Sequence, residues 1–167
     1  MSKVKCIGQW CPKSLEAINT PGFILRAGVL PYIPATIARE ARFLVGVKDG
    51  EYTDFGGGCK IKKKEKPFEC AARELTEEIL GVFKVHPKNI THILITGKAR
   101  PHQIVMLIRV DDFPEGLEDD FVVARAGVAK PELERIEVLT ATELSRARKI
   151  SDSLKSTKSD ILRLTRK

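Results

Sequence analysis

The sequence predicts an α+β domain in which a sheet lies between layers of helices, an α/β/α sandwich. Its 167 residues match the size of one domain, and 43% of them are hydrophobic, enough to form a core. Strand-like segments come first, followed by a helix, further strands and a second helix. The sequence contains no internal repeat and no low-complexity segment. We therefore expect a single folded domain of mixed secondary structure.

Short segments rich in large apolar residues predict the strands. Six segments have this character: 22–30, 42–47, 51–55, 90–96, 104–110 and 135–139. Asp49-Gly50 lies between the second and the third, and this dipeptide favours the tight turn of a hairpin. Residues 97–103, which include Pro101, are expected to link the next pair of strands as a loop.

The clearest helix is predicted over residues 68–80. Its apolar residues recur at helical spacing and so share one face: Phe68, Ala71, Ala72, Leu75 and Ile79. Pro67 precedes this segment and Gly81 follows it, as is typical of the two ends of a helix. These features together predict an amphipathic helix that packs on the sheet.

The C-terminal part of the chain predicts two further helices. Thr140 and Glu143 have the spacing of a capping box, so one helix is expected from Thr140 to about residue 149. A short helix is expected near residues 161–164, which are mostly apolar. Residues 111–120 are rich in acids and contain Pro114, and they predict a loop.

The formal net charge of +7 is unevenly distributed. One basic cluster lies within residues 60–66, and another lies within residues 145–167, where eight basic residues face two acidic ones. An excess of positive charge favours anionic partners such as phosphates or nucleic acid. Two interpretations stay open: solvated surface, or basic patches that flank a phosphate-rich ligand.

The termini and the cysteines predict a cytoplasmic protein. The first residues lack the apolar stretch of a secretion signal, and no apolar run approaches the roughly 20 residues of a membrane span. We therefore expect no membrane partner. The four cysteines, Cys6, Cys11, Cys59 and Cys70, form no CxxC pair, so a structural zinc site is not expected. Since the cytosol keeps thiols reduced, we expect four free cysteines.

Three glutamates indicate a site for a divalent cation. Glu74, Glu77 and Glu78 lie at positions i, i+3 and i+4, so a helix places them on one side. Like charges at this spacing destabilise a helix by about 0.2–0.5 kcal/mol unless a cation relieves them. Carboxylate oxygens suit Mg²⁺ or Mn²⁺. An ordinary exposed acidic face is the alternative interpretation of the glutamates alone.

The wider pattern resembles the box motif of the Nudix hydrolase family. Glu65 is followed by seven residues and then by Arg73-Glu74-Leu75-Thr76-Glu77-Glu78, all behind the glycines of residues 56–58. The resemblance extends over residues 22–149, which leaves 1–21 as an N-terminal extension and 150–167 as a basic C-terminal tail. It implies a mixed sheet. The sequence departs from the motif at Cys59, where the family has glycine, and by one extra residue before Gly81.

The resemblance implies a role for each matched residue. Glu74, Glu77 and Glu78 would bind the metal, together with a backbone carbonyl near Gly57 or Gly58, with Gly58 as the first candidate. Glu65 and Arg73 would fix the loop against the helix. Glu74 is the first candidate for the general base, with Glu132 and Glu134 as weaker ones. The substrate phosphates would meet the basic side chains of the loop: Lys60, Lys62 and Lys63.

The function implied is metal-dependent hydrolysis of a pyrophosphate linkage, with Mg²⁺ or Mn²⁺ as cofactor. The expected partner is a phosphate-rich small molecule, a compound linked to a nucleoside diphosphate. The same chemistry would serve mRNA decapping or the hydrolysis of a diphosphoinositol polyphosphate. A module of this fold without catalysis, or a protein that binds RNA through its basic loop and tail, is the alternative. The oligomeric state is not predicted.

Overall fold

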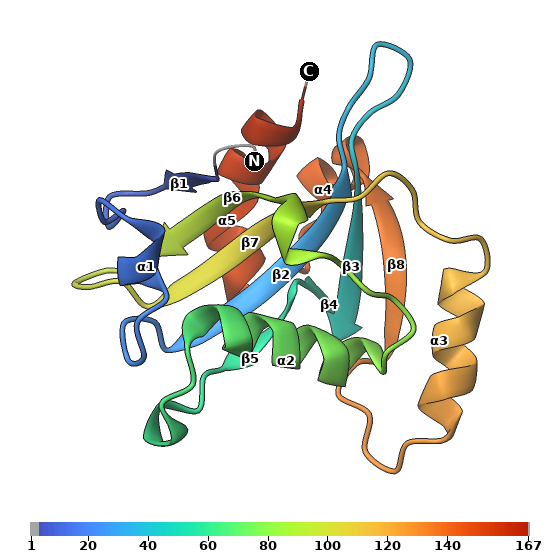
Figure 1. The fold of residues 1–167 in the computed structure, drawn as a ribbon. Coiled ribbons are helices and arrows are strands. Elements are labelled where there is room, and N and C mark those ends of the chain that lie inside the picture. The colour runs from blue at the N-terminus through green and yellow to red at the C-terminus, as the bar shows by residue number, and fades with distance from the viewer. Residues whose placement is uncertain (1–3, 167) are drawn as a thin grey trace.

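The computed structural model describes residues 4–166 and shows one mixed sheet with helices on both faces (Figure 1). The strands are β1 (Lys5–Ile7), β2 (Arg26–Ile33), β3 (Arg42–Lys48), β4 (Glu51–Thr53), β5 (Phe55–Gly58), β6 (Ile90–Thr96), β7 (Gln103–Arg109) and β8 (Arg135–Thr140). The helices are α1 (Leu15–Ile18), α2 (Pro67–Ile79), α3 (Leu117–Ala126), α4 (Ala141–Arg146) and α5 (Asp152–Thr165). Two short 3₁₀ turns, η1 (Ile61–Lys63) and η2 (Pro87–Asn89), lie in the connections.

The sheet combines parallel and antiparallel pairs, so the predicted α+β class with a mixed sheet is confirmed. The strand order is β1-β6-β7-β2-β3-β4, with β5 also pairing with β2 and β8 with β3. The β2–β7 and β1–β6 pairs are parallel, and the other pairs are antiparallel. Strand β2 is buried on both faces, which explains its nearly continuous apolar sequence.

Two apolar layers hold the helices to the sheet. Figure 1 shows α2 in front of the sheet and α5 behind it. Residues of β2 alternate between the layers, because successive side chains of a strand point to opposite faces. Ala27 and Val29 belong to the layer that contains α2, whereas Leu30 belongs to the layer that contains Leu154 and Ile161 of α5.

Several elements differ from the prediction. Helix α5 is much longer than the short helix expected near residues 161–164, because Leu154, Thr157 and Ile161 form a buried stripe between polar residues. Helix α3 begins inside the segment predicted as an acidic loop, and its first turn carries three acids that favour the positive end of the helix dipole. Strand β1 and helix α1 were not expected.

The first and third predicted strands were also placed inaccurately. Strand β2 continues through Pro31, which lies between the residues paired with β5 and those paired with β3, so the missing N–H breaks neither ladder. The third predicted strand divides at Asp54 into β4 and β5. The glycines of residues 56–58, which were not assigned to a strand, belong to β5 and pair with β2.

The expectation of four free cysteines is wrong. Cys6 is bonded to Cys11, and Cys59 is bonded to Cys70, with Cα–Cα distances of 5.8 and 5.2 Å. Cys59 follows β5 directly, and Cys70 lies in the second turn of α2 where that helix packs on β5. Sequence spacing alone does not reveal this proximity. Among residues 4–166, no helix is long and apolar enough to cross a membrane.

Candidate metal centre

Helix α2 supplies the acidic residues of the site. It begins at Pro67, where the missing N–H of proline costs nothing, and the Lys66 N–H donates to Glu69 Oε1 at 3.1 Å. It ends at Leu80 and Gly81, both with positive φ. The apolar face of α2 packs on β2 and β5, which directs the neighbouring acidic face toward the glycines of β5.

Gly57 allows the close approach of α2 to β5. A Cβ atom at this position would lie 2.5 Å from the carboxyl carbon of Glu74, so any other residue here would displace that carboxylate. Glycine therefore permits the carboxylate of Glu74 to lie directly against the strand backbone. The glycine-rich sequence behind the motif thus has a structural reason at this residue.

Three carboxylates from two distant parts of the chain converge here. Oxygen atoms of Glu74, Glu78 and Glu132 all lie within 4.8 Å of one another. Glu74 and Glu78 are buried, whereas Glu132 is exposed on the loop before β8. Glu77 lies one turn away, half-exposed, and Glu134 instead accepts the Gly50 N–H at 3.2 Å.

Glu78 has the most perturbed acidity of the cluster. Its burial, together with the negative charges of Asp54, Glu132 and Glu74, raises its pKa to about 8. Its Oε1 atom is buried and has no hydrogen-bond partner among the described residues. An unpartnered buried oxygen inside a group of carboxylates fits a hard divalent cation such as Mg²⁺ or Mn²⁺.

We expect Glu78 to make the stability of the metal-free protein fall as the pH rises from about 4.5 to about 8. The folded protein keeps the Glu78 proton up to about pH 8, whereas the unfolded chain releases it near the ordinary value of 4.5. The folded state therefore binds more protons in this window, and the free energy of unfolding decreases with pH. Urea unfolding of the wild type and Glu78→Gln isolates this contribution. Identical pH dependence in the two proteins would contradict it.

Arg73 connects the loop, the glycine strand and the helix. Its Nε and Nη2 atoms donate to the two carboxylate oxygens of Glu65 at 2.7 and 3.0 Å. Nη1 donates to Glu74 at 2.9 Å and to Glu77 at 3.1 Å, and Nη2 also donates to the Gly58 carbonyl at 3.1 Å. The hydrogen bonds from Arg73 lower the pKa of Glu65 to about 2. Arg73 therefore holds three expected metal-site residues in one network.

Replacing Arg73 by methionine should lower metal-dependent activity about 10- to 100-fold, as is typical when a group that orients metal ligands is lost. The carboxylate of Glu65 would lose its bidentate partner, and Glu74 would lose a hydrogen bond. Arg73→Lys should retain little more activity than Arg73→Met, because an ammonium group cannot make the forked contacts of a guanidinium group. Activity of purified variants at saturating Mg²⁺ measures the effect. Wild-type activity in Arg73→Met would exclude a positioning role.

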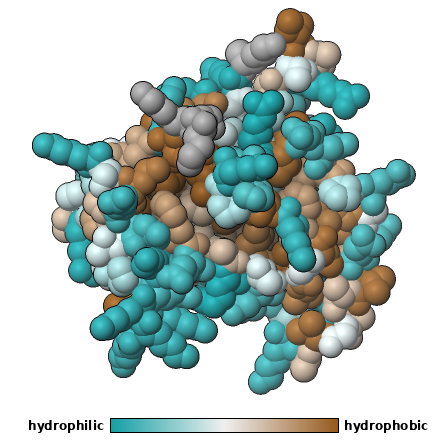
Figure 2. All heavy atoms as spheres, in the orientation of Figure 1, coloured by the Kyte–Doolittle hydropathy of each residue, from teal (hydrophilic) through white to brown (hydrophobic). Residues whose placement is uncertain are grey.

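The predicted substrate-binding lysines lie outside the carboxylate cluster. Lys60, Lys62 and Lys63 are exposed in and before η1, and the Lys60 N–H donates to Glu65 Oε1 at 2.9 Å. Figure 1 shows this loop extending beyond the N-terminal end of α2, and Figure 2 shows its hydrophilic surface at the lower left. The side chains are free to meet an anion that extends from the site.

A buried ion pair behind the sheet was not predicted. Asp54 is fully buried and accepts two hydrogen bonds from Arg26, at 2.9 and 3.0 Å, and one from Ser153 of α5 at 2.6 Å. A Cβ atom at Gly28 would overlap the Asp54 carboxylate. The only sequence signal is an acid inside an otherwise strand-like segment, which does not identify its partners.

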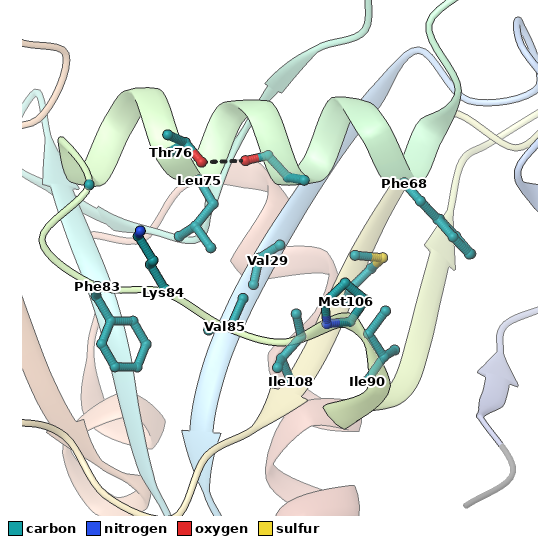
Figure 3. A pocket seen from close by; sticks show the side chains of 13 residues that line it. Val29, Phe68, Leu75, Thr76, Phe83, Lys84, Val85, Ile90, Met106 and Ile108 are labelled. Carbon is teal, nitrogen blue, oxygen red and sulfur yellow. Dashed lines mark hydrogen bonds between the residues drawn. The ribbon is translucent and has the colours of Figure 1, made fainter. Parts of the chain in front are cut away.

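A separate apolar pocket of about 300 Å³ lies between α2 and the sheet (Figure 3). Leu75 of α2, Val29 of β2 and Met106 of β7 line it, together with the segment that contains Phe83. Among the described residues, none of the clustered glutamates lines this pocket, and Lys84 is its one charged residue. It is thus distinct from the metal centre.

Solved structures share the fold, although no family model and no curated protein matches the sequence. A hydrolase of the Nudix family from Clostridium perfringens is 16% identical, with a TM-score of 0.48 over 85% of this chain and 97% of that one. The C-terminal domain of mouse MUTYH, solved in complex with human PCNA, is 13% identical, with a TM-score of 0.53 over 84% and 89%. NrtR from Shewanella oneidensis is 14% identical, with a TM-score of 0.50 over 85% and 63%.

At these identities, the likeness concerns the fold alone. Proteins described as members of the Nudix or MutT/nudix family are among these structural neighbours, with TM-scores below 0.5 and in line with the resemblance predicted from the sequence. The arrangement of helices around the mixed sheet is that of the Nudix fold.

Proposed function

We propose that this chain is a metal-dependent hydrolase that cleaves a pyrophosphate linkage in a compound linked to a nucleoside diphosphate. The observation that carries the proposal is the convergence of the carboxylates of Glu74, Glu78 and Glu132, in which Glu78 also has a buried oxygen without a hydrogen-bond partner among the described residues. Such a set of oxygens suits Mg²⁺ or Mn²⁺, with substrate phosphates completing the coordination. A bound ion would activate a water and neutralise charge on the phosphates.

Each residue of the candidate site would have a separate role in metal and substrate binding. Glu74 and Glu78 would hold the metal from the helix, and Arg73 would keep Glu74 and the Gly58 carbonyl in place. Glu77 reaches the same network from the exposed side of α2. The exposed lysines of the loop would attract the polyphosphate by simple charge attraction, which salt screens.

Two carboxylates are candidates for the base that deprotonates water. Glu74 follows from the family resemblance, but it already accepts a hydrogen bond from Arg73 and packs against Gly57. Glu132 comes from an exposed loop and faces the same cluster. Loss of a base lowers kcat with little change in Mn²⁺ affinity, whereas loss of a ligand lowers that affinity. Comparing Glu74→Gln with Glu132→Gln therefore assigns the role.

An open hollow of about 1050 Å³ offers room for the nucleoside. Trp10, Arg100 and Lys155 line it, and so does Gln103, which pairs with Arg26 of β2. Arg26 in turn pairs with Gly58 of β5, so the single strand β2 separates the strand that borders the hollow from the glycine strand. An aromatic ring with cations beside it suits a base and its phosphates.

A substrate panel tests the proposal. Nucleotide sugars, dinucleoside polyphosphates, nucleoside triphosphates, capped RNA and diphosphoinositol polyphosphates would be incubated with Mg²⁺, with Mn²⁺ or with a chelator. We expect chelator-sensitive hydrolysis with ¹⁸O from water entering a phosphate product. Glu78→Gln serves as the inactive control. If no compound is hydrolysed but RNA is retarded in gels, with less retardation for Lys62→Gln/Lys63→Gln, the non-catalytic alternative replaces the proposal.

A further inference from the structure

The Cys59–Cys70 disulfide lies inside the candidate site. Cys59 directly follows Gly58 and occupies the motif position at which the family has glycine. Cys70 is fully buried on α2, one helical turn before Glu74. The bond therefore ties the end of the glycine strand to the helix that carries the carboxylates.

The surroundings of the bond connect it to the metal residues. The Cys70 sulfur lies 3.7 Å from the carbonyl oxygen of Gly57, the residue against which Glu74 packs. The next carbonyl, that of Gly58, accepts a hydrogen bond from Arg73. The Cys59 N–H donates to the Leu25 carbonyl at 2.8 Å, which anchors the other side of the bond beside β2. A change at the two sulfurs thus acts directly on the backbone under Glu74.

The two sulfurs differ in access. Cys59 is partly exposed at the start of the lysine loop, whereas Cys70 has no exposed surface. An external thiolate can therefore attack the sulfur of Cys59, and the sulfur of Cys70 leaves as the thiolate. Once protonated, the Cys70 thiol lies within donor distance of the Gly57 carbonyl.

We propose that Cys59 and Cys70 form a reversible redox site that controls the metal centre. A dithiol reductant would convert the disulfide into two thiols and would itself become a cyclic disulfide, with transfer of two electrons and two protons. A disulfide oxidant would reverse the step. The bonded form fixes Gly57 and Gly58 against α2, and the reduced form leaves this contact to the Arg73 network and to the apolar packing of α2 on β5.

The Cys6–Cys11 disulfide provides a matched control. It lies in the N-terminal segment around β1, and neither cysteine belongs to the carboxylate group or contacts Arg73. Its removal by Cys6→Ser/Cys11→Ser leaves the proposed redox site intact. The redox proposal rests on the proposed hydrolase function, but the effect of the disulfide on metal affinity can be measured without any substrate.

The test compares the oxidised and dithiothreitol-reduced full chain by calorimetric titration with Mn²⁺, with thiols counted by alkylation after denaturation. Reduction of the wild type and of Cys6→Ser/Cys11→Ser should weaken Mn²⁺ binding about 10-fold, the scale on which supporting groups affect metal sites. Reoxidation should restore it. Cys59→Ser/Cys70→Ser should bind like the reduced protein and should not respond.

Three outcomes decide the matter. Unchanged Mn²⁺ affinity when Cys59 and Cys70 are both reduced overturns the redox proposal, and so does a bond that resists reduction in the folded protein. If Cys59→Ser/Cys70→Ser fails to fold, as judged by circular dichroism, the Mn²⁺ affinity of the reduced wild type still tests the proposal. A redox-dependent Mn²⁺ affinity without hydrolysis of any substrate supports the redox site and overturns the proposed hydrolase function instead.

Discussion

Replacing Glu78 by glutamine should reduce metal-dependent hydrolysis at least about 100-fold. Mutating a residue that only supports a metal ligand already costs up to about 100-fold, and the loss of a ligand itself should cost no less. The buried Oε1 atom of Glu78 has no hydrogen-bond partner in the described part of the protein, so the substitution changes the carboxylate that would bind the proposed cation. Glutamine has the shape of the protonated acid. Because the Glu78 pKa is raised to about 8, the metal-free fold already accommodates that shape at neutral pH.

Glu134→Gln is the matched control for this experiment. Glu134 precedes β8 as Glu132 does, but its side chain accepts the Gly50 N–H and stays outside the carboxylate group. Activity should therefore stay within about two-fold of wild type, as for most surface changes away from a site. Thermal unfolding confirms that both variants fold. Full activity in Glu78→Gln would refute the assignment of the metal centre.

Replacing Arg26 by methionine should destabilise the fold by about 3–5 kcal/mol, the usual cost of leaving a buried charge without its partner. Asp54 is fully buried, and Arg26 supplies two of its hydrogen bonds. The remaining donors, the hydroxyl groups of Ser153 and Thr53, are uncharged and cannot neutralise the carboxylate. For a chain of this length, the melting temperature should fall by roughly 6–20 °C.

The control is Arg163→Met, which breaks an exposed pair with Asp160 on α5. Exposed pairs contribute about 0–1 kcal/mol, so this variant should unfold close to wild type. Differential scanning calorimetry of both variants gives the comparison. The double change Arg26→Met/Asp54→Asn should recover part of the loss, because it removes the uncompensated charge as well. Equal melting temperatures for wild type and Arg26→Met would show that Asp54 is stabilised by other means.

The helix period explains why the centre of the site was predictable. A fixed spacing along α2 places Glu74 and Glu78 on one side whatever surrounds them, so the sequence was sufficient to bring them together. Glu132 joins from a loop whose path depends on α3 and β8, and no local pattern records that path. For the same reason, Glu132 and Glu134 were equivalent candidates in the sequence, and only the fold separates them.

The fold was predictable where the local sequence pattern is compatible with only one type of secondary structure. Helix α2 was expected to within one residue at each end, because its apolar period, its proline and its glycine agree. The glycines of residues 56–58 were left outside the predicted strands; glycine disfavours strands, yet here pairing with β2 overrides that preference. The length of helix α5 was underestimated because its buried stripe includes serine and threonine residues beside Leu154 and Ile161. The disulfides depend on tertiary contact and leave no local signal.

Strand β1 covers a sheet edge that could otherwise pair with another copy of the protein. Three residues, Lys5–Ile7, pair with the outer side of β6, whose backbone groups would otherwise be open to strands of other molecules. The outermost ladder on this side is short and begins with a lysine, two features that discourage further strand addition. The Cys6–Cys11 bond joins this strand to the segment that follows it. The same few residues that complete the sheet therefore also limit fibril-like self-association.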